Sequence, residues 1–171
     1  MPTGGACAKS APAVTACAVE GTPSPGDAAS ALALQRSVET SPLYTIPAST
    51  EGVAACRIRY QPDGVLGLEY RFRGGGSLHV TRDARIEYTE QDARFALTVK
   101  EAPEAILART ERVAFGPNGC GIDWRHFETQ AAEGELGVTE TIYRGEICNC
   151  QARIRRGAAG QVIGLMFRSA C

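Results

Sequence analysis

Seven cysteines carry most of the chemistry that this 171-residue sequence offers. No Cys-x-x-Cys pair occurs, so the spacing supports neither a zinc ribbon nor a thioredoxin-like redox centre. Widely separated cysteines without metal-ligand spacing favour disulfides, which form in an oxidising compartment. We therefore predict disulfide bonds at Cys56, Cys120, Cys148, Cys150 and Cys171.

The expected geometry of Cys148 and Cys150 limits their pairing. Both fall in a predicted strand, where side chains at positions i and i+2 point the same way, so each needs its own partner. Cys120 and Cys171 are the candidates, and a Cys120–Cys148 bridge would close a loop of about 29 residues, worth roughly 3 kcal/mol. The alternative is a zinc or copper(I) site built from these four cysteines and His126. Because the usual chelating spacings are missing, we predict no metal and no cofactor.

Cys17 has two competing interpretations. The stretch Val14-Thr15-Ala16-Cys17 resembles the small-residue box before the lipidated cysteine of bacterial lipoproteins. That resemblance implies a lipid anchor at Cys17. Seven cysteines cannot all pair, however, and if Cys7 is the odd one, Cys17 enters one of three bridges. The chain start has neither the basic nor the long apolar region of a signal peptide, although an export signal could have been trimmed.

Of the two histidines, His126 is the better candidate for chemistry. It alternates with Ile122 and Trp124 on one expected strand face, which favours a buried, hydrogen-bonded histidine over a catalytic base. Asp123 and Glu128 flank it, but acids on a single strand cannot oppose each other across a cleft. No motif places a nucleophile or a phosphate loop nearby, so we predict no catalytic residue. The alternative, an enzyme with a site around His126, requires an exposed imidazole in a cleft with an acid within hydrogen-bond reach.

Four arginines form the predicted ligand-binding surface. They project from two consecutive strands joined by a short turn and share one exposed face: Arg57, Arg59, Arg71 and Arg73. The negative charge of Glu69 on the same face offsets part of their positive charge. Guanidinium groups on such a face could bind an anionic partner. The competing interpretation is a solubilising outer face. A second arginine patch lies on the last hairpin, at Arg153, Arg155 and Arg156.

These residues need strands to position them. From Val53 onwards apolar and polar residues alternate in short segments separated by turns, which is typical of an antiparallel meander. We predict an all-β fold of about nine or ten strands forming a barrel or a curved sandwich, because closure removes exposed edges. Residues 103–115 fit a short helix or turn that runs into a strand. The last thirty residues, 142–171, fit a hairpin that closes the domain.

The predicted domain organisation is simple. Residues 1–26 are rich in Ala, Gly, Pro, Ser and Thr and form a flexible tether. One disulfide-stapled domain follows at 27–171 and opens with one short helix that Asp27 could cap.

Composition bounds the function. A net charge of −1 excludes a general attraction for nucleic acid, and no apolar run approaches the 20 or so residues of a membrane span. Sixteen arginines against two lysines point to genome composition. We predict a non-enzymatic binding protein of the bacterial cell envelope, periplasmic or extracellular, whose ligand is a protein or a small apolar molecule. An inhibitor of a secreted hydrolase is an alternative.

Overall fold

The structure is a computed structural model that describes residues 13–61, 64–81, 85–90 and 101–169. Within these ranges the chain forms three helices and nine strands. The helices are α1 (Asp27–Val38), α2 (Pro42–Thr50) and α4 (Pro103–Phe115). The strands are β1 (Ala18–Glu20), β2 (Val53–Gln61), β3 (Gly64–Phe72), β4 (Gly76–Thr81), β5 (Arg85–Glu90), β6 (Glu128–Ala131), β7 (Thr139–Arg144), β8 (Gln151–Arg156) and β9 (Val162–Arg168).

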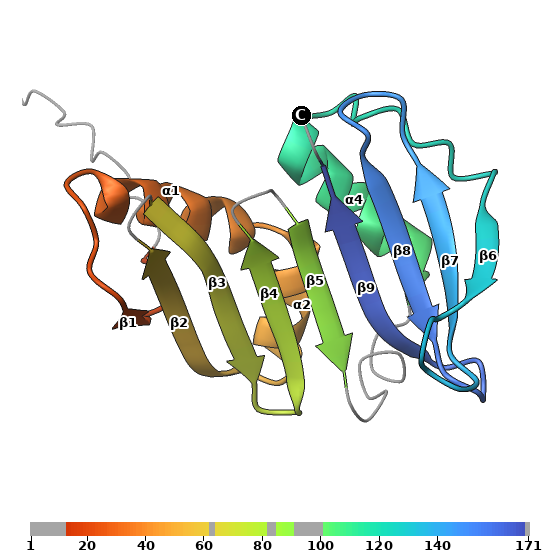
Figure 1. Ribbon diagram of the computed structural model, residues 1–171, viewed down its shortest axis with the longest axis horizontal. Helices are drawn as coiled ribbons and strands as arrows, with labels where there is room; N and C mark the ends of the chain where they lie inside the picture. Colours follow the sequence, from red (N-terminus) through yellow and green to blue (C-terminus); the bar gives the residue numbers. More distant parts are fainter. Residues whose placement is uncertain (1–12, 62–63, 82–84, 91–100, 170–171) are drawn as a thin grey trace, which may run out of the picture.

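The strands form one open sheet in the order β1-β2-β3-β4-β5-β9-β8-β7-β6 (Figure 1). It consists of two four-stranded antiparallel units, β2–β5 and β6–β9, joined edge to edge by the antiparallel pairing of β5 with β9. The prediction of a mostly β, largely antiparallel protein is confirmed. Of the predicted barrel or curved sandwich, the closed barrel is wrong, because β1 and β6 are the two edges of the described sheet and no described pairing joins them. The two four-stranded units fit the sandwich alternative better.

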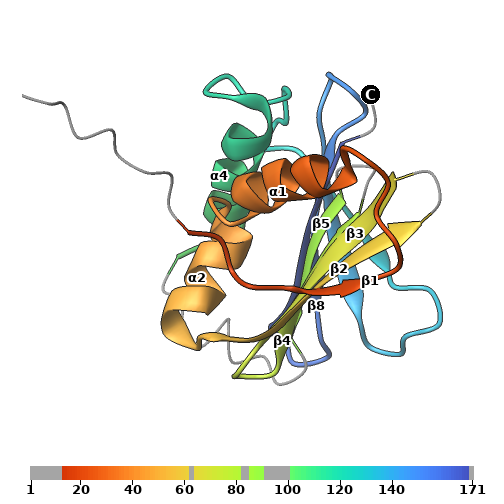
Figure 2. The ribbon, with the colours of Figure 1, turned by 90° about the vertical axis from the view of Figure 1, so that its left-hand side faces the viewer.

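All three helices pack on one face of this sheet (Figure 2). They cover the apolar face of the sheet. Because this face is buried by helices, the sheet does not need to close into a barrel to shield it from water. The prediction of a single helix is therefore wrong. α2 begins directly after Ser41, with Pro42 in its first turn, where proline is well tolerated. None of the described helices is both long and apolar enough to cross a membrane.

α4 also corrects the expected strand near Phe115. The helix continues to Phe115 and ends at Gly116, whose φ of 88° an ordinary side chain would strain. Ile106 and Leu107 lie one turn before Thr110 on the buried side of α4, and all three are at most 1 % exposed. Burial of this apolar stripe against the sheet outweighs the β-propensity of the last four residues.

The core lies between the helices and the sheet. Fully buried side chains from the helices include Leu43 and Leu107, and those from the strands include Tyr70, Leu78 and Phe167. These strand residues belong to the face predicted from the alternation of apolar and polar residues. The alternate strand residues point to the opposite face of the sheet.

The chain between β7 and β8 differs from the expectation. Cys148 and Asn149 have positive φ values of 58° and 46°, so the backbone turns here, and β8 begins only at Gln151. The predicted strand that would carry Cys148 and Cys150 on one face is therefore wrong. A similar error affects residues 122–126, which form a loop before β6.

Two disulfides join segments that are distant in the sequence. Cys17 bonds to Cys56, and Cys120 bonds to Cys150. The bridge considered for Cys120 with Cys148 is thus not formed. Cys148 is itself disulfide-bonded, and Cys171 lies outside the described residues. In this structure the Cys17 sulfur is bonded to Cys56 and so is not free for the thioether of a lipid anchor.

Candidate interaction surface

The sheet has an uncovered face on the side opposite the three helices (Figure 2), which we call the open face. Strand pairing places Arg57, Glu69 and His79 side by side across β2, β3 and β4. Further along the sheet, Met166, Arg153 and Ile142 lie side by side in the same way on β9, β8 and β7. The open face thus runs across both four-stranded units, but on the second unit Met166 and Ile142 are only 6 % and 2 % exposed.

Three of the four predicted ligand-binding arginines share the open face. Arg57 and Arg59 lie on β2, and Arg71 lies on β3. Arg73 lies just beyond β3, where its backbone N–H donates to the carbonyl of Gly52. Within the described residues, the carboxylates of Glu20 and Glu69 pair with the other three arginines and not with Arg73, so the structure brings together a trio and leaves Arg73 at the strand end.

Two carboxylates hold this trio in place. Glu69 lies 3.2 Å from Arg71 Nε and 3.5 Å from Arg59 Nη2. Glu20 of β1 lies 3.4 Å from both Arg57 Nη1 and Arg59 Nε. Exposed ion pairs of this kind add only about 0–1 kcal/mol to stability. Their main effect here is to orient the guanidinium groups.

The charge of Glu69 is secured by its neighbours. Its partial burial alone would raise its pKa, but the hydrogen bond from Arg71 and the positive charges of His79, Arg71 and Arg59 lower that pKa below the usual value. Glu69 therefore stays ionised at neutral pH. Three arginines against two carboxylates leave this part of the open face positively charged.

A hollow of about 360 Å³ opens beside the trio, between β3 and β4. Arg71, Ser77 and His79 line it with hydrogen-bond donors, and Glu69 lines it with an acceptor. Gly75 and Gly76 form part of its wall. The hollow can accept a polar or acidic side chain of a partner.

The second four-stranded unit repeats this charge pattern. Glu140 of β7 lies 3.0 Å from Arg153 Nη1 and 3.6 Å from Arg155 Nε, both on β8. Arg156, which was predicted in the same patch, instead donates to Thr141 Oγ1 and lies 3.8 Å from Glu104 of α4, on the helix side. Strand alternation explains this, since Arg156 lies two residues after the buried Ile154 and so points to the helix side, whereas Arg153 and Arg155 point to the open face.

The size of the open face is suitable for a protein partner. Eight strands at a spacing of about 4.8 Å and about six residues at 3.4 Å each give a surface of roughly 38 by 20 Å. The resulting area of about 780 Å² is close to the 800 Å² or so that one partner buries in a standard interface.

His126 lies in a different environment from the one expected. Its side chain is 82 % exposed, and its Nδ1 lies 2.6 Å from Asp123 Oδ2. The prediction of a buried histidine is wrong because the segment is a loop and not a strand. The backbone N–H and the guanidinium of Arg125 donate to Asp123, as does His126, and these bonds hold the pKa of Asp123 well below its usual range.

A hollow of about 210 Å³ adjoins this pair and is lined also by Phe127, Glu128, Ile142 and Arg144. An Asp–His pair of this geometry can orient an imidazole as a general base. None of these lining residues is a serine, threonine or cysteine, so the pair could activate only water or a bound substrate group. Among the described residues, no cluster of three His, Cys, Asp or Glu side chains is arranged to hold a metal ion.

Several residues of the charged surface were missed by sequence reasoning. Glu20 lies in the predicted tether, and Glu140 was treated as part of a plain strand. The alternation of residues in β7 and β8 does contain a signal for Glu140, whereas no local pattern marks Glu20. No family model matches the sequence, and no curated protein or solved structure is detectably similar to it.

Proposed function

We propose that the protein is a non-enzymatic binding protein of the bacterial cell envelope that docks a partner protein on its open face. The observation that supports this most is the trio Arg57, Arg59 and Arg71, which two carboxylates orient on a sheet face that no described helix covers. The partner surface would be acidic, because complementary charge accelerates association and disfavours other partners.

The disulfides support an exported protein. Cys17–Cys56 and Cys120–Cys150 fit an extracytoplasmic location, since such bonds persist in oxidising compartments. We propose the periplasm or the cell exterior. Of the two ligand classes expected from the sequence, a protein is favoured over a small apolar molecule, because Glu69, Arg71 and His79 bring charged and polar groups to the hollow beside the trio.

The test uses charge reversal on the two faces of the molecule. The double variant Arg57→Glu and Arg71→Glu changes the open face, and the matched control Arg36→Glu and Arg112→Glu changes exposed positions on the helices by the same charge. A photo-crosslinking residue in place of Ser77 would report partners from an envelope extract. We expect the open-face variant to lose at least tenfold of the crosslinked product and the control to keep it. Equal yields from both variants would contradict the proposal.

An inhibitor of a secreted hydrolase is a special case of this function. The hairpin between β6 and β7 exposes Leu136 completely, and an apolar side chain on a protruding turn can enter a cleft of a partner. If a hydrolase is among the crosslinked partners, its activity should fall on titration with the protein. Leu136→Asp would then weaken the inhibition.

A second candidate function is an enzyme with a site at His126. It is favoured by the exposed imidazole and by the 2.6 Å contact with Asp123. Hydrolysis of chromogenic esters and phosphate esters by wild type and by His126→Ala would separate the two functions. The binding proposal expects equal, background rates, whereas a site at His126 requires activity that the variant loses.

A further inference from the structure

The segment of residues 13–20, part of the predicted tether, is bound to the domain in an extended conformation. It passes α1 and α2 and then runs along the outer edge of β2, as the orange-red chain in Figure 2 shows. Its last three residues form β1, which pairs parallel with β2 in the register Ala18–Arg57 to Glu20–Arg59, whereas the other described strand pairs are antiparallel.

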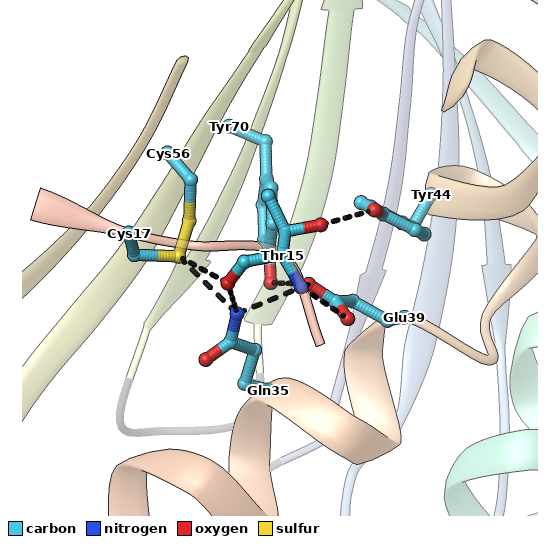
Figure 3. Close-up of a disulfide and its surroundings, with 7 residues drawn as sticks. All are labelled: Thr15, Cys17, Gln35, Glu39, Tyr44, Cys56 and Tyr70. Atoms are coloured by element: carbon cyan, nitrogen blue, oxygen red, sulfur yellow. Dashed lines mark hydrogen bonds between the residues drawn. A yellow bond between two sulfur atoms is a disulfide. The ribbon is translucent and has the colours of Figure 1, made fainter. Parts of the chain in front are cut away.

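Thr15 is the most closely held residue of this segment (Figure 3). Its backbone N–H donates to the carboxylate of Glu39, at 3.1 and 3.2 Å, and its carbonyl oxygen accepts a 2.5 Å hydrogen bond from Gln35 Nε2. Its hydroxyl lies 2.6 Å from the hydroxyl of Tyr44. Tyr70 completes the arrangement by donating to Glu39 at 3.2 Å. We call Gln35, Glu39, Tyr44 and Tyr70 the Thr15 slot.

The slot belongs to the folded domain and not to the segment that fills it. Gln35 lies in the last turn of α1 and Glu39 follows its last residue, so the two are one turn apart and face the same side of the helix. Gln35 is only 3 % exposed and Tyr70 is fully buried, so both are fixed by the packing around them. The slot presents a donor for a backbone carbonyl and an acceptor for a backbone N–H of one residue. This chemistry recognises the backbone of an extended peptide. The outer edge of β2 enlarges the site, because it can pair with the same peptide by strand addition.

One covalent bond keeps the chain's own segment in place. Cys17, two residues after Thr15, is bonded to Cys56 of β2. The linker to α1, residues 21–26, contains two prolines and two glycines, Gly21 and Gly26, with φ values of 89° and 90°. Short linkers of this kind favour the exchange of a terminal strand between copies, because each copy regains the same contacts.

We propose that the Thr15 slot and the outer edge of β2 form a peptide-binding site. It is occupied here by residues 13–20 of the same chain, and reduction of Cys17–Cys56 allows the same segment of a second copy to replace them. In the reducing step a dithiol gives two electrons and two protons, so the S–S bond becomes two thiols and the dithiol becomes a cyclic disulfide. Reoxidation by glutathione disulfide then links Cys17 of one copy to Cys56 of the other and releases two molecules of glutathione.

The first test traps a peptide at the slot. The full chain with Cys17→Ser is incubated in a glutathione buffer with a fluorescent peptide of residues 13–20, which retains its cysteine. We expect capture at Cys56 at least tenfold above that of a scrambled peptide with the cysteine at the same position. A peptide with Thr15→Pro, which lacks the N–H that Glu39 accepts, should be captured as weakly as the scrambled one. Equal capture of all three peptides would overturn the binding site.

The second test uses the wild-type chain and so does not depend on a variant that folds. Unlabelled and ¹⁵N-labelled protein are mixed, reduced with limiting dithiol and reoxidised at increasing concentration. We expect a covalent dimer whose yield rises with concentration and whose peptide map joins Cys17 of one isotope to Cys56 of the other. If Cys17 returns only to its own Cys56 at every concentration, the second copy is not the occupant and that part of the proposal is wrong.

Discussion

Two buried tyrosines each donate a hydrogen bond to a carboxylate on a helix. Tyr70 donates to Glu39 at the C-terminal end of α1, and Tyr143 donates to Glu104 of α4 at 3.1 Å. Burial and, after it, the negative charge of Glu104 raise the pKa of Tyr143 to about 12. Burial and the negative charge of Glu39 likewise raise the pKa of Tyr70. Because the pKa values in the folded state exceed the ordinary value of 10, the stabilisation is fully present below pH 10 or so and is lost as the pH rises.

The free energy of unfolding should therefore fall between about pH 10 and pH 12. The Tyr143→Phe variant should lose part of this dependence, by up to about 2 kcal/mol across the window, because it has no phenol to ionise at that position. Urea unfolding at a series of alkaline pH values checks this, with tyrosinate absorbance followed in parallel. An identical slope for wild type and variant would show that Tyr143 ionises no later than an exposed tyrosine.

Residues whose role depends on strand alternation were predictable, and residues whose role depends on a distant partner were not. The alternation placed Tyr70 in the core and Arg57 and Arg71 on the exposed face, as the structure shows. Glu39 and Glu111 carry no such signal. Glu111 is 6 % exposed and accepts hydrogen bonds from the backbone of Cys120 and from Trp124, contacts that only the folded chain brings together.

At the scale of elements, the Cys120–Cys150 disulfide fixes two segments without regular structure. It joins the loop after α4 to the turn between β7 and β8, and both sulfurs are almost fully buried. With a sequence separation of 30, loop-closure entropy predicts a stabilisation of roughly 3–4 kcal/mol. The double variant Cys120→Ser and Cys150→Ser should lose about this much.

Urea unfolding followed by circular dichroism measures this loss, and the matched comparison is Cys17→Ser with Cys56→Ser, whose separation is 39. Both pairs should cost similar free energies if the bonds act on the unfolded chain. A much larger loss for the Cys120–Cys150 pair would show that this bond also maintains the folded conformation of the loop after α4 and the turn between β7 and β8.

The elements that sequence reasoning mistook are those set by long-range packing. α4 was interpreted partly as a strand because its last residues have β-propensity, yet a continuous helical stripe covers the sheet there. α2 is nine residues long with proline at its first position and another inside it, so its local propensity is low. Its burial over β4 and β5 and against α4 maintains it instead. Residues 95–99, where the alternation from Val53 onwards predicts a further strand, lie outside the described residues.

At the scale of the whole molecule, the chain consists of two similar halves. Each has a helical layer on a four-stranded antiparallel meander, and Cys17–Cys56 lies in the first half whereas Cys120–Cys150 lies in the second. The halves meet where β5 pairs with β9 and where α2 packs against α4. No repeat of 20–50 residues was evident in the sequence, since this unit is longer than such a period and its similarity lies in the order of elements and not in the residues.

This arrangement predicts that the two halves unfold as one unit. Leu165 pairs with Tyr88 where β9 meets β5, is 1 % exposed and contributes to the core that both halves share. Trp124, the single tryptophan, reports on the second half by fluorescence, and far-ultraviolet circular dichroism reports on the whole sheet. In urea both signals should give the same midpoint, as a two-state transition requires. Leu165→Ala should lower the free energy of unfolding by about 2–5 kcal/mol and keep the midpoints together. If the tryptophan signal of the wild type instead changes at a separate urea concentration, the β5–β9 pairing is weaker than the packing within either half. The open face then consists of two surfaces joined by a hinge.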